Sequence, residues 1–217
     1  MSLIDLLNTE DGTQRGRIHG VVIGIITDNN DPEELGRVKV SFPWRGETGQ
    51  SDWARVATLM AGNDRGTFFL PEVDDEVIVA FDRGDMNHPY VIGALWNGVN
   101  TPPETNSDGN NNIRKIKSRS GHEIIFNDED AAEKLEIRTN AGHTIILDDT
   151  AGGEKLEIAD KTGNNKISID SVGNSINIES AMQLTIKANV VEIEGTTSLT
   201  LKSNAALTIQ GLPVKIN

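Results

Sequence analysis

The chain of 217 residues contains no cysteine, which excludes disulfides, thiolate metal sites and cysteine nucleophiles. Aromatic side chains make up only 4% of it, too few for the platforms on which nucleic-acid bases stack. Basic residues are also in the minority, with 20 Lys and Arg against 33 Asp and Glu, so the formal net charge is −13. Because nucleic-acid binding needs a basic face, we expect no nucleic-acid partner.

Long apolar runs are missing as well. No segment approaches the length of a membrane span, and residues 1–10 lack the basic and apolar regions of a signal peptide. We therefore expect a chain that is made in the cytoplasm without an export signal. Phosphate-binding glycine loops and serine nucleophile elbows are also absent from the sequence, so no catalytic residue and no cofactor is predicted.

The sequence divides into four parts. Residues 1–14 are a short N-terminal arm whose apolar side chains, Leu3, Ile4, Leu6 and Leu7, indicate either a docking element or a frayed terminus. Residues 15–98 contain β-branched and alternating runs at 17–27, 37–43, 52–57, 66–70, 76–81 and 90–96, separated by turn residues. So many short strands in this length predict a small barrel such as an OB-fold. Residues 99–112, rich in Pro, Asn and Gly, are predicted to be a linker.

Residues 113–217 are repetitive. The segment 121–128 recurs at 142–149 and the segment 133–137 recurs at 154–158, both with a spacing of 21 residues. From residue 176 onward, pairs of alternating apolar residues follow one another in steps of 7 or 8 residues: Ile176/Ile178, Leu184/Ile186, Val191/Ile193, Leu199/Leu201, Leu207/Ile209 and Val214/Ile216. Short strands with one apolar face at a small fixed period are typical of a β-solenoid.

The repeat favours three chains over one. A single chain with three strands per turn would form only about two rungs, fewer than a solenoid needs. Three intertwined chains would share one core and pair each other's strand edges, and the six strands would then span roughly 30 Å. The sequence therefore predicts an all-β homotrimer with an N-terminal OB-fold barrel and a triple-stranded β-helix over 113–217. A monomeric β-helix remains the alternative.

Several segments, taken together, resemble one family. The runs 36–44, 53–57, 71–81 and 84–98 are similar to the OB domain of phage baseplate assembly protein V and Vgr-type spikes, and 118–126 is similar to the entry into that family's needle. Asp74 departs from the family, which often has glycine in this turn. The resemblance implies a non-enzymatic central spike of a contractile phage tail or related injection machine, whose OB domains form a trimeric collar.

The resemblance also implies partners. A baseplate hub protein would bind the OB end, for which the arm residues named above are the candidates, and the needle would meet the target envelope when the sheath contracts. A PAAR-type protein would cap a blunt tip, for which the candidates are the last residues: Leu212, Pro213, Val214, Lys215, Ile216 and Asn217. The alternative is that the last strands fold over and cap the tip themselves.

The sequence gives only weak signals for metal binding or for enzymatic activity. His122 and His143 occupy equivalent repeat positions, where three copies would suit a metal, but a turn residue pointing to solvent is favoured. The acids at 128–130 and 148–149 lack the nonapeptide of calcium-binding repeats and are interpreted as loop acids. A trimeric phage tailspike that processes polysaccharide is the competing function, but the needle region has Phe126 as its one aromatic residue, which argues against sugar stacking.

Overall fold

The computed structural model describes residues 17–46 and 49–215. All of its extended elements are β-strands and its only described helices are two short 3-10 turns, so the all-β prediction is confirmed. No helix in this described part is long and apolar enough to cross a membrane. The chain divides into two compact units between Gly109 and Asn110, and each is described by itself.

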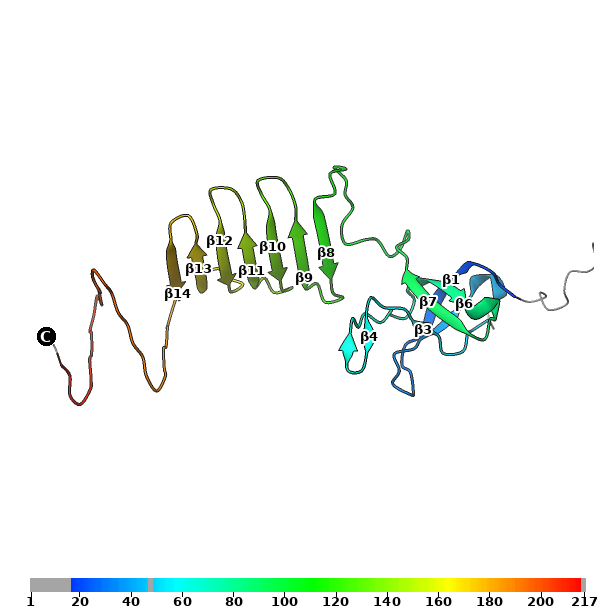
Figure 1. Cartoon of the computed structure of the whole chain (residues 1–217), viewed down its shortest axis with the longest axis horizontal. Coiled ribbons are helices and arrows are strands. Elements are labelled where there is room, and N and C mark those ends of the chain that lie inside the picture. The colour runs from blue at the N-terminus through cyan, green and yellow to red at the C-terminus, as the bar shows by residue number, and fades with distance from the viewer. Residues whose placement is uncertain (1–16, 47–48, 216–217) are drawn as a thin grey trace, which may run out of the picture. The chain divides into compact units, whose positions relative to one another are not determined.

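The N-terminal unit is built on one strongly curled sheet. Its elements, labelled in Figure 1 where there is room, are β1 (Val21–Asp28), β2 (Lys39–Ser41), η1 (Pro43–Arg45), β3 (Arg55–Val56), β4 (Ala61–Gly62), β5 (Arg65–Gly66), β6 (Glu76–Phe81), η2 (Asp82–Gly84) and β7 (Pro89–Ala94). The main sheet has the order β2-β1-β6-β7-β3. Just before its two outer strands, Val38 and Ala54 exchange backbone hydrogen bonds of 2.9 and 2.7 Å. This bridge brings the edges of the sheet together, as in a small barrel.

Alternation along the strands places the core inside this barrel. Strand β6 alternates between half-buried and buried side chains, and its buried residues are Val77, Val79 and Phe81. They pack with the other fully or nearly fully buried apolar residues: Ile26, Val38, Val40, Phe42, Ala54 and Val91. Gly24 is required where β1 crosses β2, because a Cβ there would lie 2.2 Å from the Val40 side chain.

One predicted strand of this unit is wrong. The run 66–70 was expected to be extended and paired, but only its first residue lies in a strand, in the two-residue hairpin β4–β5. The amide of Thr67 donates to the carbonyl of Met60 and closes that hairpin, after which residues 67–70 have no strand partner. Phe68 and Phe69 are consequently exposed by 78% and 70%.

The C-terminal unit begins as a single-layer antiparallel sheet. Its seven strands follow chain order, side by side in Figure 1: β8 (Ile113–Lys117), β9 (Glu123–Asn127), β10 (Lys134–Arg138), β11 (Thr144–Asp148), β12 (Lys155–Ala159), β13 (Lys166–Asp170) and β14 (Ser175–Glu179). The repeat of 21 residues therefore corresponds to two strands and their two turns. From Ser180 to Lys215 no residue lies in a strand of this single chain, and every residue is exposed.

Candidate functional site

The seven-stranded sheet has one apolar face and one polar face. Cross-strand registers align the apolar side chains, with one arginine at the start, in two continuous columns that run from strand to strand. The first column consists of Ile116, Ile124, Ile137, Ile145, Ile158, Ile167 and Ile178. The second starts at Arg114 and continues through Phe126, Leu135, Leu147, Leu156, Ile169 and Ile176. We call these two columns the needle face.

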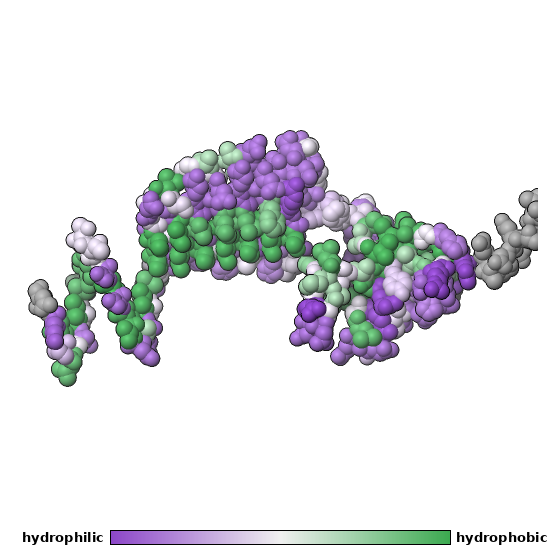
Figure 2. All heavy atoms as spheres, in the orientation of Figure 1, coloured by the Kyte–Doolittle hydropathy of each residue, from purple (hydrophilic) through white to green (hydrophobic). Residues whose placement is uncertain are grey.

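Among the described residues of the C-terminal unit, no second layer of strands covers the needle face. Ile145, Leu156 and Ile158 remain exposed by 40%, 44% and 52%, although neighbouring strands flank them on both sides. Figure 2 shows the apolar residues as a band that crosses the strands. A contiguous apolar surface of this kind marks an interaction site, because a sheet is stable only when its apolar face is buried.

The opposite face carries charges in complementary registers. Lys134 lies opposite Asp148, Asp148 lies opposite Lys155, and Lys155 lies opposite Asp170 in successive strand pairs. Ion pairs join Lys117 to Glu123 at 3.1 Å, among others, on the same face. Opposite charges directly across a strand pair are favourable and like charges are not, so this pattern supports the observed register.

The turns between the strands form their own ladder. The Nδ1 atom of His143 accepts a hydrogen bond of 3.2 Å from the amide of Lys161, which lies in the next turn on the same side of the sheet. One repeat earlier His122 accepts from Asn140 in the same way. In the described part of the chain no group of three or more His, Cys, Asp or Glu side chains is arranged to hold a metal ion. Within one chain both histidines accept hydrogen bonds that join neighbouring turns.

The ladder ends where the strands end. Asn165 takes the place that histidine has in the earlier repeats, and its side-chain oxygen accepts from the amide of Ala181 at 3.1 Å. The hydroxyl of Ser180 donates to the same oxygen at 3.1 Å. Beyond this point the alternating apolar residues, for example Ile186 and Ile193, are exposed by 67% and 61%. Residues 182–215 thus have the pattern of strands without partners within the chain.

The predicted tip and arm residues are only partly described. Leu212 is fully exposed and Val214 is exposed by 49%, whereas Ile216 and Asn217 lie outside the described residues. The whole proposed hub contact, Leu3, Ile4, Leu6 and Leu7, also lies outside them. The structure therefore leaves both predicted contacts as predictions.

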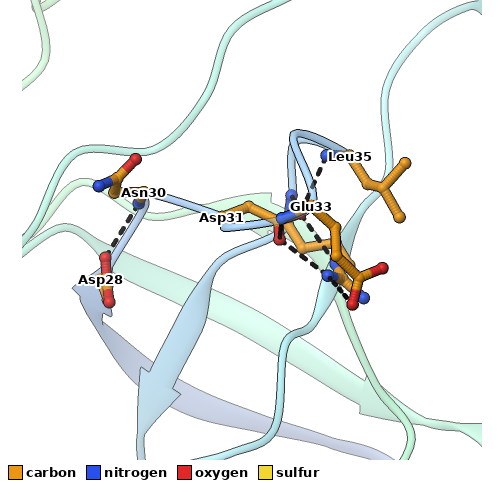
Figure 3. Close-up of polar contacts among 6 residues, drawn as sticks. Asp28, Asn30, Asp31, Glu33 and Leu35 are labelled. Carbon is orange, nitrogen blue, oxygen red and sulfur yellow. Dashed lines mark hydrogen bonds and ion pairs between the residues drawn. The ribbon is translucent and has the colours of Figure 1, made fainter.

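An acidic loop in the barrel was missed by the sequence analysis. The Asp31 carboxylate, in the loop between β1 and β2, accepts hydrogen bonds from Arg37 Nε at 2.8 Å and Nη2 at 2.7 Å. It also accepts from the amides of Glu33, Leu35 and Arg37 (Figure 3). The Arg37 guanidinium, with these amides, holds the pKa of Asp31 well below its usual range, although partial burial opposes the shift. The spacing of Asp31, Gly36 and Arg37 is the only signal for this loop in the sequence.

The fold and the apolar face define a class. A curled barrel sheet is followed by an antiparallel sheet with an exposed apolar face. Residues 22–96 match the family of type VI secretion system and phage-baseplate injector OB domains. Residues 22–96 of the N-terminal unit therefore form an OB domain of the kind found in phage-baseplate and type VI injectors, and the chain is similar to spike proteins of such machines.

Individual relatives agree with this assignment. The chain is 32% identical over 134 residues to the type VI secretion system spike protein VgrG1a of Pseudomonas aeruginosa, a match over 57% of the chain. It is 40% identical over 98 residues, or 41% of the chain, to VgrG2a of the same species. It is 32% identical over 111 residues, or 48% of the chain, to the actin cross-linking toxin VgrG1 of Vibrio cholerae. These matches cover 21%, 12% and 10% of the respective relatives.

Proposed function

We propose that three copies of this chain form the central spike of a contractile phage tail or a phage-tail-like injection machine. The observation that carries the proposal is the needle face, which is apolar in both columns from β9 to β14 and has no second layer of strands among the described residues of the C-terminal unit. Burial of an Ile or Leu side chain stabilises by roughly 1.5–3 kcal/mol, so covering two columns of them favours association strongly.

The segment after Ser180 favours three copies over two. Two sheets packed face to face would also bury the needle face, but they would leave the steps of 7 or 8 residues unexplained. Around a three-sided prism each step carries one chain to the next side, where its edges pair with strands of the two other chains. Such a rod unfolds only when all three chains separate, which gives the kinetic stability that a puncturing device needs.

The needle would therefore have two parts. Over residues 113–179 each chain contributes its own antiparallel sheet to one side of the prism. After Ser180 the three chains intertwine, and the free edge of β14 offers the first backbone partners. The assembled particle would act outside the producing cell or enter the target when it fires, with the needle crossing the target envelope.

A separate protein would cap the tip. The apolar pattern continues to the last described residues, where Leu212 and Val214 are exposed. Three such ends would present strand edges and apolar side chains, which recruit another chain. A PAAR-type protein is the proposed occupant of residues 212–217.

At the other end we propose a baseplate hub protein as partner. The arm residues Leu3, Ile4, Leu6 and Leu7 are its proposed contact, since clustered apolar residues on an otherwise polar arm suit a docking element. Binding of the hub by a chain that lacks residues 1–14 measures this contact. Unchanged affinity would show that the hub binds elsewhere.

The mass in solution tests the spike itself. Native mass spectrometry of the full chain should give three times 23.5 kDa at micromolar concentration. A folded monomer would contradict the proposal, and a dimer would favour the face-to-face sandwich instead. Dilution provides the control, since an intertwined trimer should dissociate far more slowly than a surface contact.

A further inference from the structure

The run 67–70 of the barrel has the form of a strand without a partner. The chain makes no turn or bend between residues 67 and 72. The amide of Thr67 donates to the carbonyl of Met60 at 3.1 Å, on the side of the hairpin β4–β5. Among the described residues, none hydrogen-bonds to the backbone groups of Phe68, Phe69 or Leu70. A straight run with unpaired backbone groups is a place where another strand can be added.

One edge of this run is open. In an extended chain, successive residues direct their backbone groups to opposite sides. Because Thr67 is directed toward the hairpin, Phe69 is directed there as well. The hydroxyl of Thr58 donates to the carbonyl of Thr67 at 2.5 Å and so occupies the hairpin side. A new strand would therefore pair on the other side, with the amides and carbonyls of Phe68 and Leu70.

An apolar groove accompanies the open run. Its volume is about 840 Å³, and two of its lining residues, Val56 and Leu70, pack against the barrel core. The large apolar residues that line it and remain exposed are Leu35, Met60, Phe68 and Phe69. Two successive side chains of a strand point to opposite faces, so the exposure of both phenylalanines means that neither face of the run is covered. An added strand would place alternate side chains in this groove.

The surroundings of the groove are acidic. Between residues 59 and 75 the acidic residues are Asp64, Glu72, Asp74 and Asp75, whereas Arg65 is the only basic one. Glu34 adds a further carboxylate to the lining of the groove. Arg37, in the neighbouring loop, is already bound to the Asp31 carboxylate at 2.7 Å. Basic residues therefore suit the ends of an added strand, because complementary charges select the partner.

We propose that the run 67–70 binds an extended segment of another protein as an added strand, with alternating apolar side chains and Lys or Arg at its ends. Charge disfavours segments of this chain as occupants. The arm 1–14 contains Asp5, Glu10 and Asp11 and no basic residue, and a second copy has a net charge of −13. The site shares no residue with the contacts proposed at 1–14 and 212–217. Strand addition to one barrel needs no second copy, so the inference goes beyond the proposed function.

A synthetic peptide tests the charge and the shape of the partner. The probe alternates valine and threonine between a pair of lysines at each end, carries a fluorescent label, and is titrated with the full chain while its anisotropy is measured. We expect it to bind. The same peptide with glutamates in place of the lysines should bind at least about ten-fold more weakly. No binding of the lysine peptide, or equal binding of the two peptides, would overturn the inference.

Two proline variants test which edge is used. Phe68→Pro and Phe69→Pro each remove one exposed phenyl ring and one amide proton that has no partner among the described residues. Phe68→Pro removes a donor from the open edge and should weaken binding of the lysine peptide about ten-fold, whereas Phe69→Pro should weaken it much less. Both variants keep the net charge of −13, so a nonspecific attraction of the lysines would be the same in both. Equal affinities of the two variants would overturn strand addition.

Modified peptides give a check that does not depend on the folding of a variant. N-methylation of alternate peptide amides should prevent binding to the native chain for one set of positions and be tolerated for the other, because only one set faces the spike. Equal tolerance of both sets would contradict strand addition.

A single thiol identifies a competing occupant. The chain has no native cysteine, so Phe68→Cys introduces its only thiol. A short bis-maleimide should leave this variant without covalent dimers on denaturing electrophoresis, and the lysine peptide should protect the thiol from a maleimide label. Efficient crosslinking between copies would assign the groove to a second copy of this chain and overturn the inference.

Discussion

The imidazole of His143 accepts a hydrogen bond from the backbone amide of Lys161, a residue of the next turn, at 3.2 Å. The contact ties successive turns of the sheet to each other outside the strand ladder. Because His122 makes the same contact and Asn165 a similar one, it recurs in every repeat. The sheet thus has a lateral support that depends on one acceptor in each repeat.

Removal of that acceptor should weaken the sheet. We expect His143→Leu to lower the free energy of unfolding by about 0.5–1.5 kcal/mol per chain, the range for one lost hydrogen bond. His143→Asn should lose much less, because asparagine provides a side-chain oxygen and is the residue found at position 165. Denaturant titration of both variants measures the difference. If both variants lost the same free energy of unfolding, His143 would stabilise the sheet through packing of its ring and not through its hydrogen bond.

Adjacent residues on opposite faces test the needle face. Ile145 belongs to the apolar columns, whereas Ile146 lies on the charged face between Glu136 and Glu157. Ile145→Lys should abolish the trimer, because three ammonium groups would be buried in an apolar core at several kcal/mol each. Ile146→Lys should leave the trimer intact, since its new charge lies between two carboxylates. Analytical ultracentrifugation of both variants measures their oligomeric state. The same oligomeric state in both would contradict the assignment of the two faces.

The same logic applies to the segment after Ser180. Ile186→Asp and Ile193→Asp should lower the melting temperature sharply, because their pairs are predicted to point toward the axis. Lys187→Asp and Glu192→Lys are the matched controls on the outward side, and their effect should stay within about 0.5 kcal/mol. If the inward and outward variants melt alike, the proposed register of the intertwined strands is wrong.

Acid should weaken the barrel through Asp31. The Arg37 guanidinium holds the pKa of Asp31 below its ordinary value of about 3.8. A lowered pKa means that the carboxylate contributes its full stabilisation above that ordinary value and loses it as the pH falls further. Asp31→Asn should therefore lower the melting temperature at neutral pH, and the difference from the native chain should shrink below pH 3.8. Asp64→Asn, at the exposed hairpin tip, is the control and should change the melting temperature at neutral pH little.

The tip can be tested by truncation. Removal of residues 212–217 should abolish binding of a PAAR-type protein and leave the trimeric mass unchanged, because the remaining strands still interlock. Surface plasmon resonance with the two spikes provides the comparison. Full binding by the shortened spike would show that residues 212–217 are not the binding site. It would agree with a tip whose last strands fold over and cap it.

Local pattern predicted much of this protein from the sequence. Alternation and turn residues were sufficient for an all-β chain and an N-terminal barrel, because strand periodicity and turn chemistry are local properties. The repeat of 21 residues likewise indicated equivalent positions for His122 and His143, and the structure gives them the same contact. An apolar and aromatic run does not by itself provide a strand partner, however, so the run 66–70 was wrongly predicted as a strand.

Only the tertiary structure decided which residues face each other. The change at Ser180, from a sheet within the chain to a segment without partners, is invisible in the apolar pairs, since Ile176 and Ile178 in β14 resemble the later ones. The outward side of β1 and β6 also required the strand registers, because an apolar run does not show which of its two sides the barrel covers. The carboxylate of Asp31 needed the loop to close before five donors converged on it. Periodicity is a property of the sequence, whereas strand partners and exposed faces depend on how the chain is arranged in space.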